Sequence, residues 1–220
     1  RHWKRVGVNI TCTAATNSIQ SLPRFPAGAI QTPIERMIWK MAEILIFGGG
    51  ASGMMAAVAA AQCGNLVTLF EKNEKLGKKL LITGKGRCNI TNNAEVEDRF
   101  PAVISNPKFL YSAFYSFTNE QTVEFFEDLG VKTKVERGGR VFPLSDHSSD
   151  VIRALEREMK RLNVRVFLNS EVCGLSVRDD EVKGLVVSGG RKIRGDAVIV
   201  ATGGNSYPPT CSTGDGYRFA

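Results

Sequence analysis

The spacing of hydrophobic positions changes several times along the chain and divides it into short elements. Continuous apolar runs over 42–47 and 66–70 predict buried strands, and the Ala-rich stretch over 52–63 between them predicts a helix. Apolar side chains at every third or fourth position over 149–162 predict another helix. A strand–helix–strand order is typical of an α/β domain built on a parallel sheet.

Shorter signals predict the remaining elements. Thr118 and Gln121 fit a capping box and predict a helix start, and Asp179 with Asp180 predicts the tight turn of a hairpin. The stretch over 71–106 lacks a sustained period and is predicted to be a long loop. The other predicted segments are helices over 107–117 and 118–129, strands over 131–137, 140–143 and 164–168, a β-meander over 171–178, 182–188 and 191–194, and a strand over 196–201.

The composition is that of an ordinary globular protein. Of 220 residues, 43% are hydrophobic and 23% are charged, which excludes a disordered or collagen-like chain. The five cysteines are widely spaced and form no Cys-x-x-Cys pair, so neither a zinc site nor a disulfide framework is expected. Cys63 and Cys173 are expected to be small buried hydrophobic residues. His147 is expected to lie in a loop or helix cap and to have no catalytic role.

The formal net charge of +7 is concentrated in two segments. Residues 1–40 hold six basic residues against one acidic residue, and residues 71–93 hold six against two. A protein that binds nucleic acid through phosphates needs a basic face spread over its fold. This distribution therefore argues against nucleic acid as a partner.

Residues 1–40 are predicted to lie outside the fold. The segment is basic and rich in hydroxyl side chains, so it fits either a mitochondrial transit peptide or an upstream extension before a natural start at Met41. We prefer the second interpretation, with 41–220 as the folded domain and a cytoplasmic location. Three glycines interrupt the uncharged run over 44–61, which favours strand, turn and helix over a membrane span.

A glycine turn carries the strongest chemical signal in the chain. Gly48, Gly50 and Gly53 satisfy the G-x-G-x-x-G pattern between a predicted strand and a predicted helix. Gly48 allows a tight turn, Gly50 lets the backbone approach a pyrophosphate, and Gly53 lets the helix pack closely on the sheet. The first helical residues, Ala51 and Ser52, would direct N–H groups and the positive end of the helix dipole at phosphates.

An acid stands where such a turn requires one. Glu71 ends the second predicted strand, about twenty residues after the turn, where a carboxylate accepts hydrogen bonds from adenosine ribose hydroxyls. Its charge would repel the 2′-phosphate of NADP, although Lys72 beside it weakens that exclusion. NAD and FAD both fit this pattern.

Several segments together resemble a known family. Besides the glycine turn they are EKNEKLGKKLLITGKGRCNITN at 71–92, ATGGNSYP at 201–208 and STGDGY at 212–217. They resemble the BaiN/YhiN-like flavoproteins, a group of NAD(P)/FAD-dependent or aminoacetone-oxidase-type oxidoreductases. Cys211 stands where this family has glycine. The resemblance implies an α/β, Rossmann-like FAD-binding domain with a parallel sheet and a β-meander, incomplete at its C-terminus, with a substrate domain and a final FAD segment beyond it.

The resemblance also implies positions for the cofactor. Its ADP half would lie on the glycine turn, Arg87 and Asn89 would lie near the flavin, and Thr202 with Gly203 would close over it. Val172 would contact adenine through its backbone.

Two features of the basic loop bear on this site. The basic cluster of Lys78, Lys79, Lys85 and Arg87 is suited to neutralising a pyrophosphate. Cys88 suggests a redox role beside a flavin, but it has no resolving cysteine next to it in the sequence.

The implied function is that of an FAD-dependent oxidoreductase. It would transfer hydride between flavin and a small organic substrate, with NAD(P)H as a candidate electron donor. We nominate no acid, base or nucleophile, and we expect the chain to bind FAD weakly or not at all without the family's later segments. Two alternatives stay open: a dinucleotide-binding module of a tRNA-modifying or regulatory flavoprotein, and a simple NAD-dependent dehydrogenase.

Overall fold

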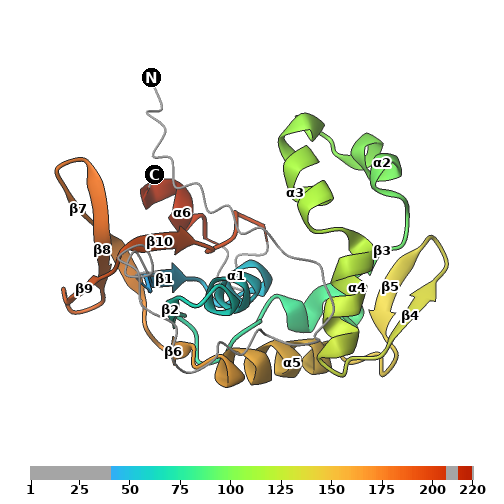
Figure 1. Ribbon diagram of the computed structural model, residues 1–220, viewed down its shortest axis with the longest axis horizontal. Coiled ribbons are helices and arrows are strands. Elements are labelled where there is room, and N and C mark those ends of the chain that lie inside the picture. Colours follow the sequence, from blue (N-terminus) through green and yellow to red (C-terminus); the bar gives the residue numbers. More distant parts are fainter. Residues whose placement is uncertain (1–40, 207–212, 220) are drawn as a thin grey trace, which may run out of the picture. The chain divides into compact units, whose positions relative to one another are not determined.

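A computed structural model describes residues 41–206 and 213–219 (Figure 1). Of these, residues 42–206 and 213–219 belong to one compact unit. The predictions made for 1–40 and for Cys211 lie outside the described residues.

A parallel four-stranded sheet forms the centre of this unit. Its order is β10-β1-β2-β6, with β1 at Glu43–Phe47, β2 at Leu66–Phe70, β6 at Arg165–Phe167 and β10 at Ala197–Val200. The two central strands are the ones predicted from continuous apolar runs, which fit strands covered on both faces. The α/β, Rossmann-like class expected from the sequence is confirmed.

Alternate residues of β1 serve two separate cores. Ile44 and Ile46 pack against helix α1 (Ala51–Gln62) and helix α5 (Ser148–Arg161). Leu45 and Phe47 point to the other face, where strands β7 and β8 cover them. Because side chains alternate between the faces of a strand, one uninterrupted apolar run can supply both cores.

The strands on that second face form the predicted β-meander. They are β7 at Val172–Arg178, β8 at Glu181–Val187 and β9 at Lys192–Arg194, all antiparallel. Asp179 and Asp180 connect the first two with φ of +54° and +58°. Two successive left-handed residues are what a tight hairpin turn requires, so the predicted turn is confirmed.

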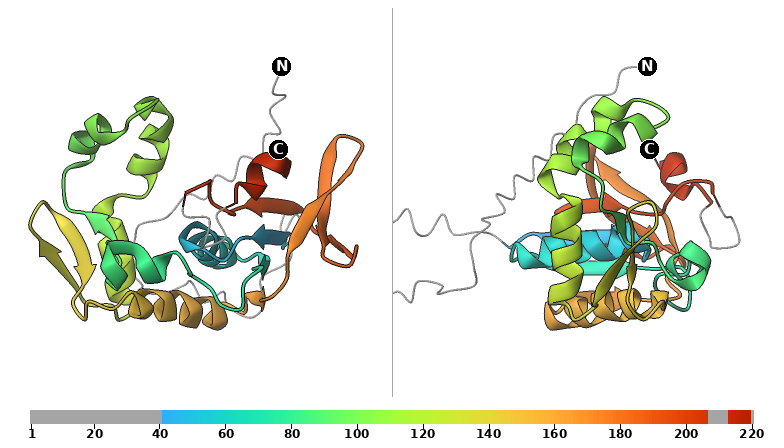
Figure 2. Two further views of the ribbon diagram at one scale, coloured as in Figure 1. Left: turned by 180° about the vertical axis from the view of Figure 1, so that it is seen from behind. Right: turned by 90° about the vertical axis from the view of Figure 1, so that its right-hand side faces the viewer.

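A smaller antiparallel sheet lies beyond α1. Its order is β3-β5-β4, with β3 at Thr91–Asn92, β4 at Thr133–Glu136 and β5 at Arg140–Pro143. Figure 2 shows α5 running from this sheet to the main sheet, so that one helix connects the two parts.

The helix beside the smaller sheet begins as predicted. Helix α4 spans Asn119–Asp128, and Thr118 and Gln121 form the expected capping box with reciprocal hydrogen bonds.

The prediction of a structureless loop over 71–106 is wrong. This stretch contains the 3₁₀ segment η1 (Leu80–Gly86), strand β3 and helix α2 (Val96–Arg99). A two-residue strand and one-turn helices are too short to produce a hydrophobic period, so pattern analysis cannot find them. The remaining short elements are η2 at Phe100–Ala102, η3 at Pro107–Leu110, α3 at Tyr111–Ser116 and α6 at Asp215–Phe219.

Candidate dinucleotide-binding site

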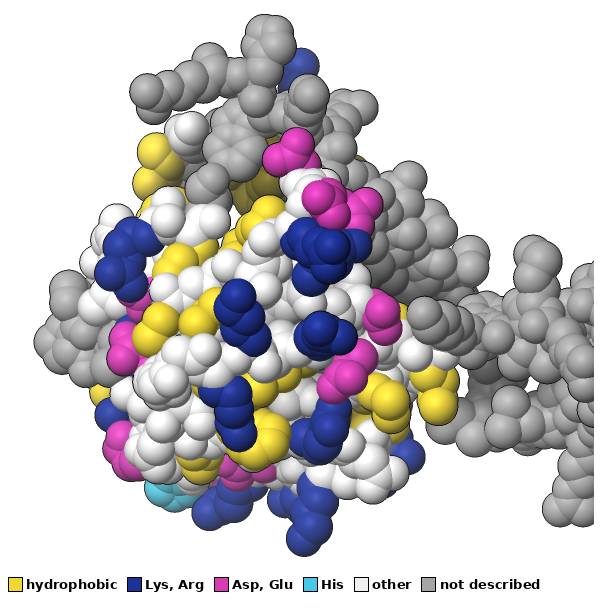
Figure 3. All heavy atoms as spheres, turned by 90° about the vertical axis from the view of Figure 1, so that its left-hand side faces the viewer, with side chains coloured by type: hydrophobic (Ala, Val, Ile, Leu, Met, Phe, Trp, Pro, Cys, Tyr) yellow, Lys and Arg dark blue, Asp and Glu magenta, His cyan; other side chains and the backbone are white. Residues whose placement is uncertain are grey.

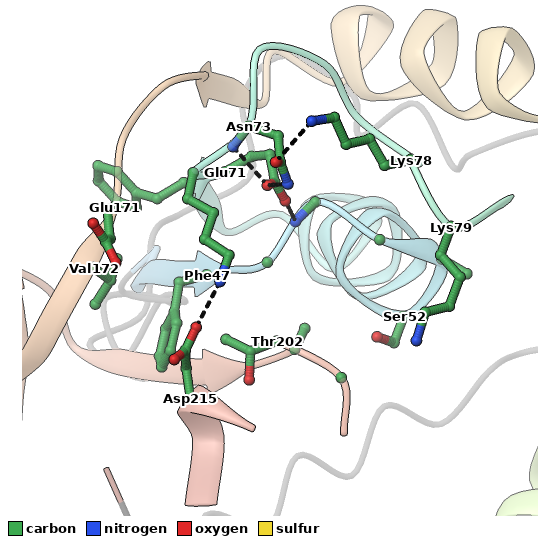
Figure 4. Close-up of a pocket in the computed structure, with 18 of the residues that line it drawn as sticks. Phe47, Ser52, Glu71, Asn73, Lys78, Lys79, Glu171, Val172, Thr202 and Asp215 are labelled. Atoms are coloured by element: carbon green, nitrogen blue, oxygen red, sulfur yellow. Dashed lines mark hydrogen bonds and ion pairs between the residues drawn. The ribbon is translucent and has the colours of Figure 1, made fainter. Parts of the chain in front are cut away.

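A cavity of about 350 Å³ opens at the carboxyl ends of β1 and β2, where parallel sheets of this kind bind ligands (Figure 4). The glycine turn, the start of α1 and the segment after β10 form its walls. The predicted site residues that line it are Gly48, Gly50, Ala51, Ser52, Glu71, Lys72, Val172, Thr202 and Gly203.

The three signature glycines have separable roles in the geometry. A Cβ on Gly48, whose φ is +106°, would lie 2.3 Å from the Ala201 carbonyl oxygen. A Cβ on Gly53 would lie 1.8 Å from the Gly48 carbonyl oxygen, so this glycine lets the turn and helix pack although it does not line the cavity. A Cβ on Gly50 would meet no atom within 4 Å. The backbone at Gly50 therefore lies open to the cavity, as close approach of a pyrophosphate requires.

Glu71 is buried, and the surrounding chain fixes its carboxylate in one orientation (Figure 4). The Gly49 N–H donates to Glu71 Oε2 at 2.5 Å. The backbone N–H and side-chain amide of Asn73 donate to Oε1 at 2.8 and 2.5 Å. A carboxylate has about four acceptor positions, so Oε2 keeps capacity for a ligand hydroxyl.

Sequence reasoning missed the two residues that hold this carboxylate. Gly49 is the unassigned glycine of the turn, and Asn73 lies two residues beyond the acid. Both lie in the motifs that carry the family resemblance, and those motifs are the part of the sequence that could have identified them.

Two lysines connect separate walls of the cavity. Lys72 Nζ lies 2.8 Å from Asp215 Oδ2 and 3.0 Å from Thr213 Oγ1. Lys79 Nζ donates to the Ser206 carbonyl oxygen at 2.8 Å. The Lys72 ammonium holds the pKa of the Asp215 carboxyl below its ordinary value. Asp215, which the sequence interpretation did not nominate, therefore anchors α6 to the end of β2.

Helix α6 also holds the segment after β10 through a hydrogen bond. The Gly216 N–H donates to Thr202 Oγ1 at 3.0 Å. Gly203 follows with a φ of +74°. Val172, at the start of β7, lines another part of the cavity (Figure 4).

Arg87 and Asn89 do not line the cavity. The Arg87 guanidinium lies over the Phe142 ring at 4.2 Å and donates to Glu136 at 2.9 Å. The Asn89 amide nitrogen, oriented by its neighbours, donates to the Thr91 carbonyl oxygen at 2.8 Å. The smaller sheet, which the sequence analysis did not foresee in full, engages both side chains.

The three cysteines that the structure describes give no support to a thiol reaction at the cavity. Cys88 is buried outside its lining, and burial raises the pKa of its thiol. Cys63 is half-buried, and the expectation that Cys173 is buried is wrong, because its side chain is exposed on β7. In the described part of the chain no group of His, Cys, Asp and Glu side chains is arranged to hold a metal ion, and no helix is long and apolar enough to cross a membrane.

The observed strand, glycine turn and helix, with a buried acid at the end of the neighbouring strand, define a Rossmann-like dinucleotide-binding domain. The chain belongs to the HI0933-like family, because residues 42–220 match the description "HI0933-like protein Rossmann domain". The family resemblance drawn from the sequence motifs is thereby confirmed.

Curated relatives extend this comparison. The chain is 38% identical to the 3-dehydro-bile acid delta(4,6)-reductase of Clostridium scindens, a match that covers 82% of this chain and 43% of the relative. It is 32% identical to the ribosomal RNA dihydrouridine synthase of Escherichia coli, covering 81% of this chain and 43% of the relative. The chain thus spans less than half the length of these relatives. Because this second relative is named for ribosomal RNA, the expectation that nucleic acid is not a partner has no support from the comparison.

Solved structures share the fold. The 3-ketosteroid-delta4-(5alpha)-dehydrogenase of Rhodococcus jostii RHA1 superposes with a TM-score of 0.56 at 15% identity, covering 79% of this chain and 48% of that chain. A flavocytochrome c3 fumarate reductase gives 0.52 at 25% identity, covering 74% and 34%.

Proposed function

We propose that this chain is the FAD-binding part of an oxidoreductase and that it holds the ADP half of FAD. The observation that carries the proposal is the buried Glu71 carboxylate, held by the Gly49 N–H beside the open backbone of Gly50. An adenosine ribose would contact Glu71, and the pyrophosphate would lie against the start of α1. The residues present therefore fit this cofactor.

The other cavity residues would complete its binding. The N–H groups of Gly50, Ala51 and Ser52 would bind the pyrophosphate, with Gly48 and Gly53 fixing the shape of the turn. Their free N–H groups and the helix dipole favour negative charge.

The residues after β2, the start of β7 and the segment after β10 would supply further contacts. Val172 would contact adenine through its backbone, and Lys72 would place a positive charge beside the acid. Thr202 and Gly203 would close over the cofactor, because α6 holds that segment against the cavity.

Bound FAD would supply the hydride chemistry. The protein's own residues bind it, orient it and exclude water. We propose a small organic molecule as substrate and NAD(P)H as electron donor, since the Clostridium scindens relative is named for reduction of a bile acid.

Calorimetric titration with FAD tests the proposal in the wild-type chain and in Gly50→Val. The valine would fill the open space that the pyrophosphate needs, so we expect affinity to fall by at least about tenfold. Gly174→Val is the matched control, because a Cβ on Gly174 also meets no atom within 4 Å and Gly174 lies outside the cavity. Equal FAD affinity in Gly50→Val and the wild type would contradict the proposal.

RNA is the second candidate substrate. Figure 3 shows Lys and Arg side chains on one face of the molecule, and basic residues of the β-meander line a shallow hollow beside Glu43 and Asp196. Lys192 and Arg194 line it and form no ion pair with any described residue. The Escherichia coli relative is named for a ribosomal RNA modification.

Salt-dependent RNA binding distinguishes this candidate from the first. If RNA is the substrate, the Lys192→Gln, Arg194→Gln double variant should bind ribosomal RNA fragments more weakly and with a shallower dependence on salt. Absent binding, or binding unaffected by these changes, removes the candidate and leaves FAD binding untouched.

A further inference from the structure

A turn with unusual backbone geometry forms one wall of the cavity. Its inner residues Leu80 and Thr83 line the cavity. The following residues take left-handed conformations, with φ of +59° at Lys85 and +62° at Cys88. Neither is glycine, so surrounding contacts must hold these conformations in place.

Arg87, inside this turn, makes those contacts with a hairpin some fifty positions later in the chain. Its guanidinium lies over the Phe142 ring at 4.2 Å. Its Nη1 donates to both carboxylate oxygens of Glu136, at 2.9 and 3.1 Å. Its Nε donates back to the Gly84 carbonyl oxygen at 3.4 Å, within the turn itself. One side chain thus joins the left-handed segment to strands β4 and β5.

The charge of Arg87 is balanced where it lies. Lys134 Nζ contacts Asp146 Oδ2 at 2.5 Å and Glu136 Oε1 at 3.5 Å, and Asp146 Oδ1 lies 3.5 Å from Arg87. Two cations and two carboxylates close into one network. Arg87 is therefore engaged with protein carboxylates, and it lies outside the cavity lining.

We propose that Arg87 is a positioning residue that clamps the cavity-lining turn onto the β4–β5 hairpin. The proposal rests on the proposed function, because the turn matters for FAD only if the cavity binds it. Arg87 acts on the cofactor through Leu80 and Thr83.

Removing the charge of Glu136 separates this role from direct cofactor contact. If Arg87 bound the cofactor phosphates, Glu136→Ala would free its positive charge and tighten FAD binding. If Arg87 clamps the turn, the same change loosens the clamp and weakens binding.

Replacing Arg87 itself gives a second discriminator. A lysine supplies the positive charge but not the planar group that stacks on Phe142 while donating to a carboxylate. If Arg87 clamps the turn, Arg87→Lys should therefore bind FAD as weakly as Arg87→Met. If Arg87 only contacted a phosphate through its charge, Arg87→Lys would keep the wild-type affinity.

The experiment measures FAD affinity by calorimetry and amide hydrogen exchange over residues 79–88 without FAD. We expect Arg87→Met and Glu136→Ala each to weaken FAD by about tenfold and to speed exchange in the turn. The double variant should be no weaker than Arg87→Met alone, because both changes break one contact.

Arg165→Met is the control, since it removes an ion pair with Glu43 away from the cavity and should change neither measurement. Tighter FAD binding in Glu136→Ala, or wild-type affinity in Arg87→Lys, would overturn the proposal. The exchange measurement needs no cofactor. If the wild type binds no FAD, the proposed function fails, while exchange in the turn still decides the clamp: unchanged exchange in Arg87→Met overturns it.

Discussion

At the scale of single residues, Glu71 shows how a strand end becomes a recognition group. The sequence predicts its position because β2 is a continuous apolar run that ends at this acid. Its orientation depends on Gly49 and Asn73, which close on it from the turn and from the following loop. Those partners arise from tertiary contacts, and no hydrophobic period encodes them.

Glu71→Gln should lower the affinity for FAD by about tenfold or more, because an acceptor for the ribose hydroxyls is replaced by an amide that must also face the Asn73 donors. Calorimetric titration measures the change. Glu124→Gln is the matched control, since Glu124 is exposed on α4 and lies outside the cavity lining. A Glu71→Gln variant that binds FAD as tightly as the Glu124→Gln control would exclude Glu71 as a cofactor ligand.

At the scale of elements, the pair formed by Lys72 and Asp215 attaches α6 to the end of β2. The folded protein holds the pKa of Asp215 below its ordinary value, with Lys72 as the largest cause. A depressed pKa means that the pair stabilises the folded state above the ordinary carboxyl pKa of about 3.9 and that this contribution is lost as pH falls through the lowered value.

Asp215→Asn should therefore increase amide exchange in 213–219 at neutral pH, and the difference from the wild type should shrink as pH is lowered towards 3. Hydrogen exchange followed by mass spectrometry checks this. A difference that stays constant across this pH range would show that the ion pair does not hold α6.

The elements that could be predicted are those with a clear period or a diagnostic turn. The central strands and α5 follow from apolar spacing, and the hairpin turn follows from Asp179 and Asp180. Strand β3 has two residues and depends on pairing with β5. Arg87 and Asn89 contact residues of the smaller sheet, and a hydrophobic period carries no signal for such tertiary contacts.

At the scale of the whole molecule, the net charge of +7 does not describe the binding site. The three lysines that line the cavity are engaged: Lys72 with Asp215, Lys78 with Glu74, and Lys79 with the Ser206 carbonyl oxygen. The features that favour a dinucleotide are backbone N–H groups, a helix start and one buried acid. These features lie at the carboxyl ends of two parallel strands, as the fold class requires.

The central claim is that the glycine turn and Glu71 hold the ADP half of FAD. Competition calorimetry tests it most directly: the chain is titrated with FAD in the presence of ADP or of FMN, which lacks the adenosine part. We expect ADP to weaken the apparent affinity for FAD and FMN to leave it unchanged. Competition by FMN without competition by ADP would contradict the claim.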